Sequence, residues 1–217
     1  MHLARTSPLT STRRMVLRGG LAAGGLAALI PHNGWADMPA SIPIAGHLPD
    51  LQFSMEDAET GQPVTAAAFQ DHPVILYFGF TRCPDTCPLT MQNAARLVHR
   101  LGKQAAGLRI LFVTIDPDYD TAARLKTFLA QFGAPPIFTG LRGTPDQLRR
   151  LAARYGVYYK APSGPNSPDP VSAVGHSDAT YLFGPTGKAV AILPTLPTAR
   201  PKLPQLATLL RPLLKTA

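Results

Sequence analysis

The chain has 217 residues, 45% of them hydrophobic and 16% charged, with a formal net charge of +8 at pH 7. This length fits one domain of ordinary size with an appendage, and the apolar content is enough for a hydrophobic core. Four of the 21 basic residues fall in residues 1–36, which contain no acid, and the others are scattered. Phosphate binding needs clustered cations, so the charge does not predict a nucleic-acid partner.

The N-terminal segment, residues 1–36, has the layout of an export signal. Arg13 and Arg14 form a twin arginine, and an uncharged run of twelve residues, 19–30, follows them. That run is shorter than the roughly 20 apolar residues that span a membrane. The segment resembles a twin-arginine signal cut after Ala36, and a disordered basic tail is the alternative. We therefore expect a periplasmic location, with attachment to the membrane if the signal is not cleaved.

The remainder is expected to be a short linker, residues 37–50, followed by one folded domain, residues 51–217. Continuous apolar runs at 74–78 and 108–115 predict strands that are buried on both faces. Apolar residues at helical spacing follow each strand and predict helices at 88–101 and 121–132.

The second half of the domain continues this alternation. A short strand is expected at 137–138, and a third helix should begin at Thr144 or Pro145 and end near Tyr155, with Gly156 as its stop. The remaining predicted elements are a loop at 160–172, a hairpin of strands 179–183 and 189–193, and a last helix at 202–214. Early βαβ units that end in an antiparallel pair predict an α/β thioredoxin-like fold, a central mixed β-sheet flanked by helices.

The two cysteines, Cys83 and Cys87, lie between the first buried strand and the helix that follows it. Such strand-to-helix turns are where open α/β sheets build their sites. Pro88 suits a first helical turn, so Cys87 is expected at or just before the helix start, where unpaired N–H groups stabilise a thiolate. Arg82 would add to that effect, and Asp85 would oppose it unless it turns away.

The spacing of the cysteines separates several chemistries. They are too close to staple distant parts of the fold, so they are either a redox pair or a ligand pair. Three residues lie between them, whereas thioredoxin-type oxidoreductases have two. The threonine that a peroxiredoxin carries three residues before its reactive cysteine is replaced by Phe80 or Pro84.

One histidine, His176, stands apart because it lies at the entry to the predicted hairpin. In a thioredoxin-like sheet the loop that enters this strand lies over the cysteine loop. By itself His176 is better explained as an ordinary loop residue, but the facing pair of thiols favours a ligand. His32, His47, His72 and His99 have ordinary explanations in the signal, linker, turn or helix.

Three segments together resemble the Sco/SenC family of copper chaperones. They are residues 78–88 (FGFTRCPDTCP), residues 113–121 (VTIDPDYDT), and residues 175–177 (GHS) with 181–185 (YLFGP). The resemblance covers about residues 46–215. It implies a thioredoxin-like fold and one copper ion, as Cu(I) or Cu(II), held by Cys83, Cys87 and His176.

The same resemblance implies a role in metallating the dinuclear copper centre of cytochrome c oxidase. The expected partners are the copper-bearing subunit of that oxidase and other copper or thiol proteins. Many members of the family keep an N-terminal membrane anchor, whereas residues 1–36 of this chain resemble a twin-arginine signal, so its proximity to the membrane stays open.

The donor set supports copper on chemical grounds. Thiolates hold Cu(I), thiolate with imidazole also holds Cu(II), and a structural zinc site would need a fourth ligand. Asp116 and Asp120 are not assigned to the metal, because turn formation and helix capping explain them.

Two other functions use the same thiols. A thiol-disulfide reductase that keeps partner cysteines reduced needs Cys83 and Cys87 as redox-active residues but not His176, so it stays open whether the protein is an enzyme. A copper or redox sensor would differ only in its partners.

Overall fold

The computed structural model of the chain describes residues 38–160 and 177–215. The expected signal (1–36) and His176 lie outside these ranges. Within them, eight strands form one mixed sheet in the order β1-β8-β7-β4-β5-β6-β2-β3. The strands are β1 (Ile42–Pro43), β2 (Ser54–Asp57), β3 (Pro63–Thr65), β4 (Val74–Gly79), β5 (Arg109–Thr114), β6 (Phe138–Arg142), β7 (Thr180–Phe183) and β8 (Ala189–Ile192).

The centre of the sheet is parallel and buried, as the apolar runs predict. β4 pairs in parallel with β5, and β5 with β6, while β7 pairs antiparallel on the other side of β4. All six residues of β4 are buried, which explains why its sequence has no alternation of polar and apolar residues. The predicted strand and hairpin positions in this region are confirmed.

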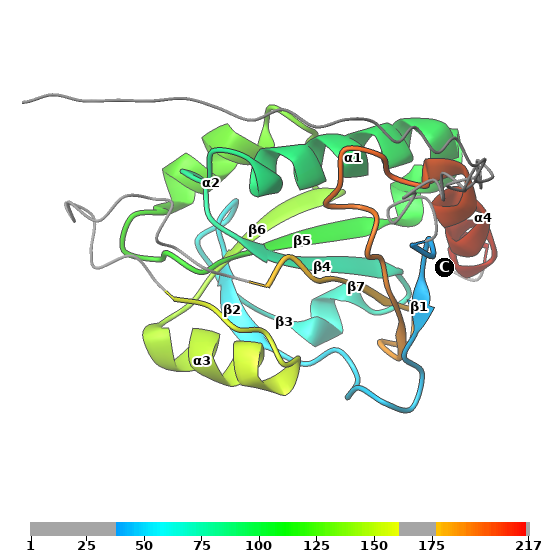
Figure 1. Cartoon of the computed structure of the whole chain (residues 1–217). Helices are drawn as coiled ribbons and strands as arrows, with labels where there is room; N and C mark the ends of the chain where they lie inside the picture. Colours follow the sequence, from blue (N-terminus) through cyan, green and yellow to red (C-terminus); the bar gives the residue numbers. More distant parts are fainter. Residues whose placement is uncertain (1–37, 161–176, 216–217) are drawn as a thin grey trace, which may run out of the picture. The chain divides into compact units, whose positions relative to one another are not determined.

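Helices cover the two faces of this sheet (Figure 1). α1 (Thr86–Leu101) and α2 (Ala122–Leu129) lie on one face, α3 (Pro145–Arg154) lies on the other, and α4 (Leu203–Leu214) packs beside α1. Among the described residues there are also two 3₁₀ turns, η1 (Ala66–Phe69) and η2 (Gly102–Gly107). No helix in residues 38–160 or 177–215 has both the length and the apolarity to cross a membrane.

The start of α3 shows how local sequence sets an element's bounds. The Thr144 hydroxyl accepts a hydrogen bond from the Gln147 amide, and the Gln147 side chain accepts one from the Thr144 amide. This reciprocal cap, with Pro145 in the first turn, fixes the helix start at the predicted position. Gly156 follows the helix with φ +65°, which suits its role as the stop.

The edge of the sheet was not anticipated from the sequence. β2 and β3 lack the run of buried apolar residues that predicts a strand, because each is short and only Met55 of β2 is fully buried. β1 lies in the segment whose composition predicts a linker, yet Ile42 and Pro43 pair with β8. Proline is compatible with an edge strand, which needs no donor on its outer side. Part of residues 37–50 is therefore built into the sheet.

Candidate metal centre

The cysteine loop runs from the end of β4 to the first turn of α1. Cys83 lies in the turn, where its amide donates to the carbonyl of Phe80 at 3.2 Å, and Cys87 is the second residue of α1. The Cys87 side chain is completely buried, whereas Cys83 is partly exposed. Cys83 is therefore the sulfur that solvent or a partner reaches first.

The two thiols are close enough to influence each other. A hydrogen bond with Cys83 raises the pKa of the Cys87 thiol most strongly, and burial and the charge of Cys83 raise it further. The hydroxyl of Tyr77 donates to Sγ of Cys87 at 3.6 Å, and this bond lowers the pKa of the thiol. The helix start was expected to favour the thiolate, but at Cys87 burial and the neighbouring sulfur outweigh that effect.

Glycine is required at the end of β4. A Cβ atom placed on Gly79 would lie 2.9 Å from Sγ of Cys87, 2.8 Å from Cε1 of Tyr77 and 2.9 Å from Cε2 of Phe112. Real Cβ atoms essentially never approach other atoms so closely. Gly79 therefore leaves the space that the Cys87 sulfur occupies against the sheet.

A buried carboxylate holds the residue two before Cys83. Asp120 accepts hydrogen bonds from the amide of Thr81 at 3.0 Å, from the Thr81 hydroxyl, and from the Thr114 hydroxyl at 2.6 Å. Burial raises the pKa of Asp120, and these hydrogen bonds lower it. Asp120 thus ties the cysteine loop to β5, a role that sequence reasoning missed because Asp before a helix is normally a cap.

Arg82 also links the cysteine loop to the loop between β5 and α2. Its Nε donates to Oδ2 of Asp116 at 2.9 Å, and its guanidinium lies 4.6 Å from the centre of the Tyr119 ring. Burial raises the pKa of Asp116, and the charge of Arg82 lowers it. Arg82 was expected to act on the thiols, but the contact that its Nε makes is with this carboxylate.

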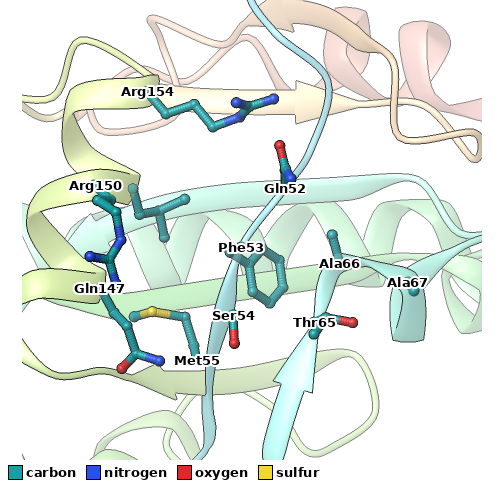
Figure 2. Close-up of a pocket in the computed structure, with 11 residues that line it drawn as sticks. Gln52, Phe53, Ser54, Met55, Thr65, Ala66, Ala67, Gln147, Arg150 and Arg154 are labelled. Atoms are coloured by element: carbon teal, nitrogen blue, oxygen red, sulfur yellow. The ribbon is translucent and has the colours of Figure 1, made fainter.

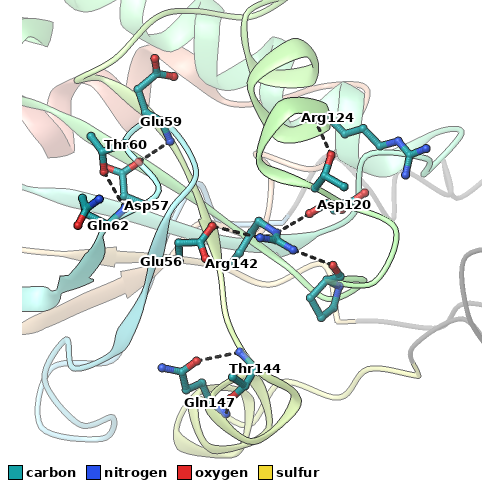
Figure 3. Close-up of polar contacts among 12 residues, drawn as sticks. Glu56, Asp57, Glu59, Thr60, Gln62, Asp120, Arg124, Arg142, Thr144 and Gln147 are labelled. Carbon is teal, nitrogen blue, oxygen red and sulfur yellow. Dashed lines mark hydrogen bonds and ion pairs between the residues drawn. The ribbon is translucent and has the colours of Figure 1, made fainter.

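The β5–α2 loop is hydrogen-bonded to β6, and through β6 it is connected to β2, near the edge of the sheet far from β1. Arg142 of β6 donates to the carbonyl of Asp120 at 2.7 Å, to that of Pro117 at 3.2 Å, and to the carboxylate of Glu56 at 3.1 Å (Figure 3). At the other end of the loop the expected cap is confirmed at Thr121, whose hydroxyl accepts from the Arg124 amide. The scaffold behind the thiols therefore reaches from β2 to α1.

The structure brings Cys83 and Cys87 together and leaves the third expected ligand untested, because His176 is outside the described residues. The nearest described strand after it is β7, whose Thr180 pairs with Tyr77 of β4. Among residues 38–160 and 177–215, no group of three or more His, Cys, Asp or Glu side chains could hold a metal ion. Asp116 and Asp120 are engaged with Arg82, Thr81 and Thr114 instead.

The sequence matches a family model and curated relatives of that same family. The family model described as SCO1/SenC matches residues 49–211. The chain is 36% identical over 137 residues to the mitochondrial SCO2 homolog of Bos taurus. These aligned residues make up 62% of this chain and 50% of that protein. It is also 37% identical over 114 residues to the SCO2-like protein of Rickettsia felis, and this alignment covers 52% of this chain and 54% of that protein. The chain thus spans about half the length of these curated relatives.

Solved structures agree with the fold. The copper-bound ScoI of Bradyrhizobium japonicum matches with a TM-score of 0.64 and 27% identity, over 76% of this chain and 98% of that one. Yeast Sco1 with copper bound matches with a TM-score of 0.63 and 31% identity, over 75% and 90%. The predicted thioredoxin-like fold is confirmed by these matches.

Proposed function

The chain belongs to the SCO1/SenC family, and from this premise we propose that it carries one copper ion and delivers it to the dinuclear copper centre of cytochrome c oxidase. The observation that carries the proposal is the pair of neighbouring thiols on the β4–α1 turn, one buried and one partly exposed. Relatives of 27% and 31% identity are described with copper bound.

The proposed ligands are Cys83, Cys87 and His176. Two thiolates and an imidazole form a soft donor set that accepts Cu(I) and, with the imidazole, Cu(II). The absence of a side chain at Gly79 lets the Cys87 sulfur pack against the end of β4, which fixes the position of this proposed donor. The partial exposure of Cys83 leaves one side of the site open, which suits an ion that must be passed on.

Anaerobic copper titration of the reduced chain tests this proposal. Wild type should bind one copper ion, and Cys83→Ser, Cys87→Ser and His176→Ala should each lose that stable complex. His99→Ala, which changes an exposed histidine on α1, is the matched control and should bind like wild type. Undiminished copper affinity in His176→Ala would remove His176 from the ligand set.

A second function, reduction of a partner's disulfide, is favoured by the contact between the thiols. The Cys83 thiolate would attack the partner disulfide and form a mixed disulfide, and one partner thiol would leave. Cys87 would then attack Cys83, releasing the second partner thiol and leaving a Cys83–Cys87 disulfide. His176→Ala separates the two functions, since it should abolish copper binding and preserve this exchange.

The location proposed for this function is the periplasm. Its support is the twin arginine and the uncharged run of residues 1–36. N-terminal sequencing of the exported protein should find a start at Asp37, and replacing Arg13 and Arg14 by lysine should prevent export. An exported protein that retains Met1 would instead be anchored by this segment.

A further inference from the structure

A groove runs along α3 on the face of the sheet opposite α1 and α2. Its larger part is a cavity of about 700 Å³ between α3, β2 and η1, with Phe53, Met55 and Leu151 among its lining residues (Figure 2). A second cavity of about 410 Å³ shares Met55 and Gln147 with the first. We call the two together the α3 groove.

The α3 groove ends beside the scaffold of the cysteine loop. The lining of its smaller part includes Pro117, Asp118 and Arg142. Pro117 and Arg142 are joined by a hydrogen bond, and Asp116, the residue before Pro117, is paired with Arg82. One end of the groove is therefore at the β5–α2 loop, which contacts the cysteine loop through Arg82. The other end is at Arg150 and Arg154.

The end of the groove distant from the cysteine loop is cationic. Arg150 and Arg154 lie one turn apart on α3, and none of the lining residues of the larger cavity is acidic. Within residues 38–160 and 177–215 neither arginine forms an ion pair. Arg154 donates to the carbonyl of Asp50 at 3.2 and 3.4 Å, and its guanidinium also contacts Tyr155, with the ring centre 6.0 Å away. Like charges at this spacing destabilise a helix, so a carboxylate between them would be stabilising. Their neighbour Arg149 already pairs with Asp146.

The rest of the lining fits a polypeptide. Gln52, just before β2, and Ser54 and Thr65, on β2 and β3, are exposed and offer amide and hydroxyl groups to a main chain. The buried side chains beneath them give an apolar surface on which aliphatic side chains can pack. Near the cysteine loop the charges are mixed, with Glu56 and Asp118 beside Arg142. This gradient would orient a bound segment with its acidic part away from the thiols.

We propose that the α3 groove docks an extended acidic and aliphatic segment of the protein that receives the copper. The inference rests on the proposed function, because it gives the recipient a binding surface next to the cysteine loop. Guanidinium–carboxylate bonds would supply orientation and speed of association, and the apolar floor would supply contact area. Copper itself would be held elsewhere, by the thiols.

The first test uses a fluorescein-labelled hexapeptide of alternating glutamate and valine, with binding to the full chain measured by fluorescence anisotropy. The peptide should bind, and Arg150→Glu and Arg154→Glu should each weaken it at least about tenfold. Arg149→Glu, with the same change of net charge on the same helix, is the control and should have little effect. Equal weakening by Arg149→Glu, or binding of a lysine–valine peptide with equal affinity, would overturn the groove as a specific site.

The second test locates the peptide and separates this inference from the copper proposal. With ¹³C-labelled methionine methyl groups, the peptide should shift the NMR signal of Met55, which lines both cavities, and not that of Met91, which is buried in α1. An unshifted Met55 signal would contradict the inference. Copper titration of Arg150→Glu should match wild type. Loss of peptide binding with intact copper binding would then show that the α3 groove, and not the copper site, binds the peptide.

Discussion

The hydroxyl of Tyr77 donates a hydrogen bond to Sγ of Cys87, with the two atoms 3.6 Å apart in the buried space between β4 and α1. Burial raises the pKa of Tyr77 above its ordinary value, and the charge of Cys87 raises it further, so the phenol stays protonated and remains a donor. A buried donor to a sulfur ligand draws electron density from that sulfur, and it thereby changes the electronic properties of a metal bound there.

Tyr77→Phe should therefore alter the copper complex without removing it. Loss of the donor leaves a more electron-rich thiolate, so the thiolate-to-Cu(II) charge-transfer band should move to longer wavelength at unchanged 1:1 stoichiometry. Absorption spectra of the Cu(II) complex measure this shift, and the loss in stability should be about 1 kcal/mol. Tyr181→Phe removes another buried tyrosine hydroxyl, bonded to the Tyr155 carbonyl at 2.8 Å, and should leave the band in place. A shift of equal size in both variants would indicate a general packing effect.

Gly79→Ala should disturb the sulfur directly. The added methyl group would meet Sγ of Cys87 and the rings of Tyr77 and Phe112, all of which are buried. We expect a loss of about 1–3 kcal/mol in the free energy of unfolding, together with weaker copper binding. Urea unfolding and copper competition measure the two effects.

The control for this prediction is Gly184→Ala. The nearest atom to a Cβ there, Cγ2 of Val190, is 3.6 Å away, which is ordinary contact. This variant should keep wild-type stability and copper affinity. If Gly79→Ala behaved in the same way, the space beside Cys87 would not be limiting.

Sequence patterns predict the centre of this fold well because burial there is periodic or continuous. The runs that become β4 and β5, and the cap and stop of α3, depend on local chemistry that a single sequence displays. β3 is stabilised by pairing with β2, and β2 by pairing with β6, whose residues lie far away in the chain. The edge of the sheet was therefore beyond local reasoning.

The same distinction applies to the site. The closeness of Cys83 and Cys87 follows from their spacing, and Thr121 follows the rules of helix capping. The partners of Arg82 and Asp120 lie 34 and 39 residues away, at Asp116 and Thr81, so only the fold reveals them. The one sequence feature that pointed to this loop was the resemblance of residues 113–121 to the family motif.

Arg82→Met should destabilise the protein by leaving Asp116 buried without its cation. The two side chains are 16% and 2% exposed, so the loss should be smaller than for a fully buried pair, about 2–3 kcal/mol. The double variant Arg82→Met with Asp116→Asn should recover part of that loss, since the uncompensated charge is gone. Urea unfolding of Arg82→Met, of the single variant Asp116→Asn and of the double variant measures this coupling, and additive losses would show that the pair does not act as a unit.

Asp120→Asn tests the carboxylate that holds Thr81. Burial raises the pKa of Asp120, so the native protein keeps this proton to a higher pH than the unfolded chain does. Between the two pKa values the native state binds more protons, and the free energy of unfolding therefore falls as the pH rises through that window. The variant has no such proton and should lose less stability than wild type over the same window. Urea unfolding at a series of pH values from about 3 to about 7 measures the two slopes. Asp118→Asn, on the exposed part of the same loop, is the control, and a slope for Asp120→Asn equal to that of wild type would contradict the assignment.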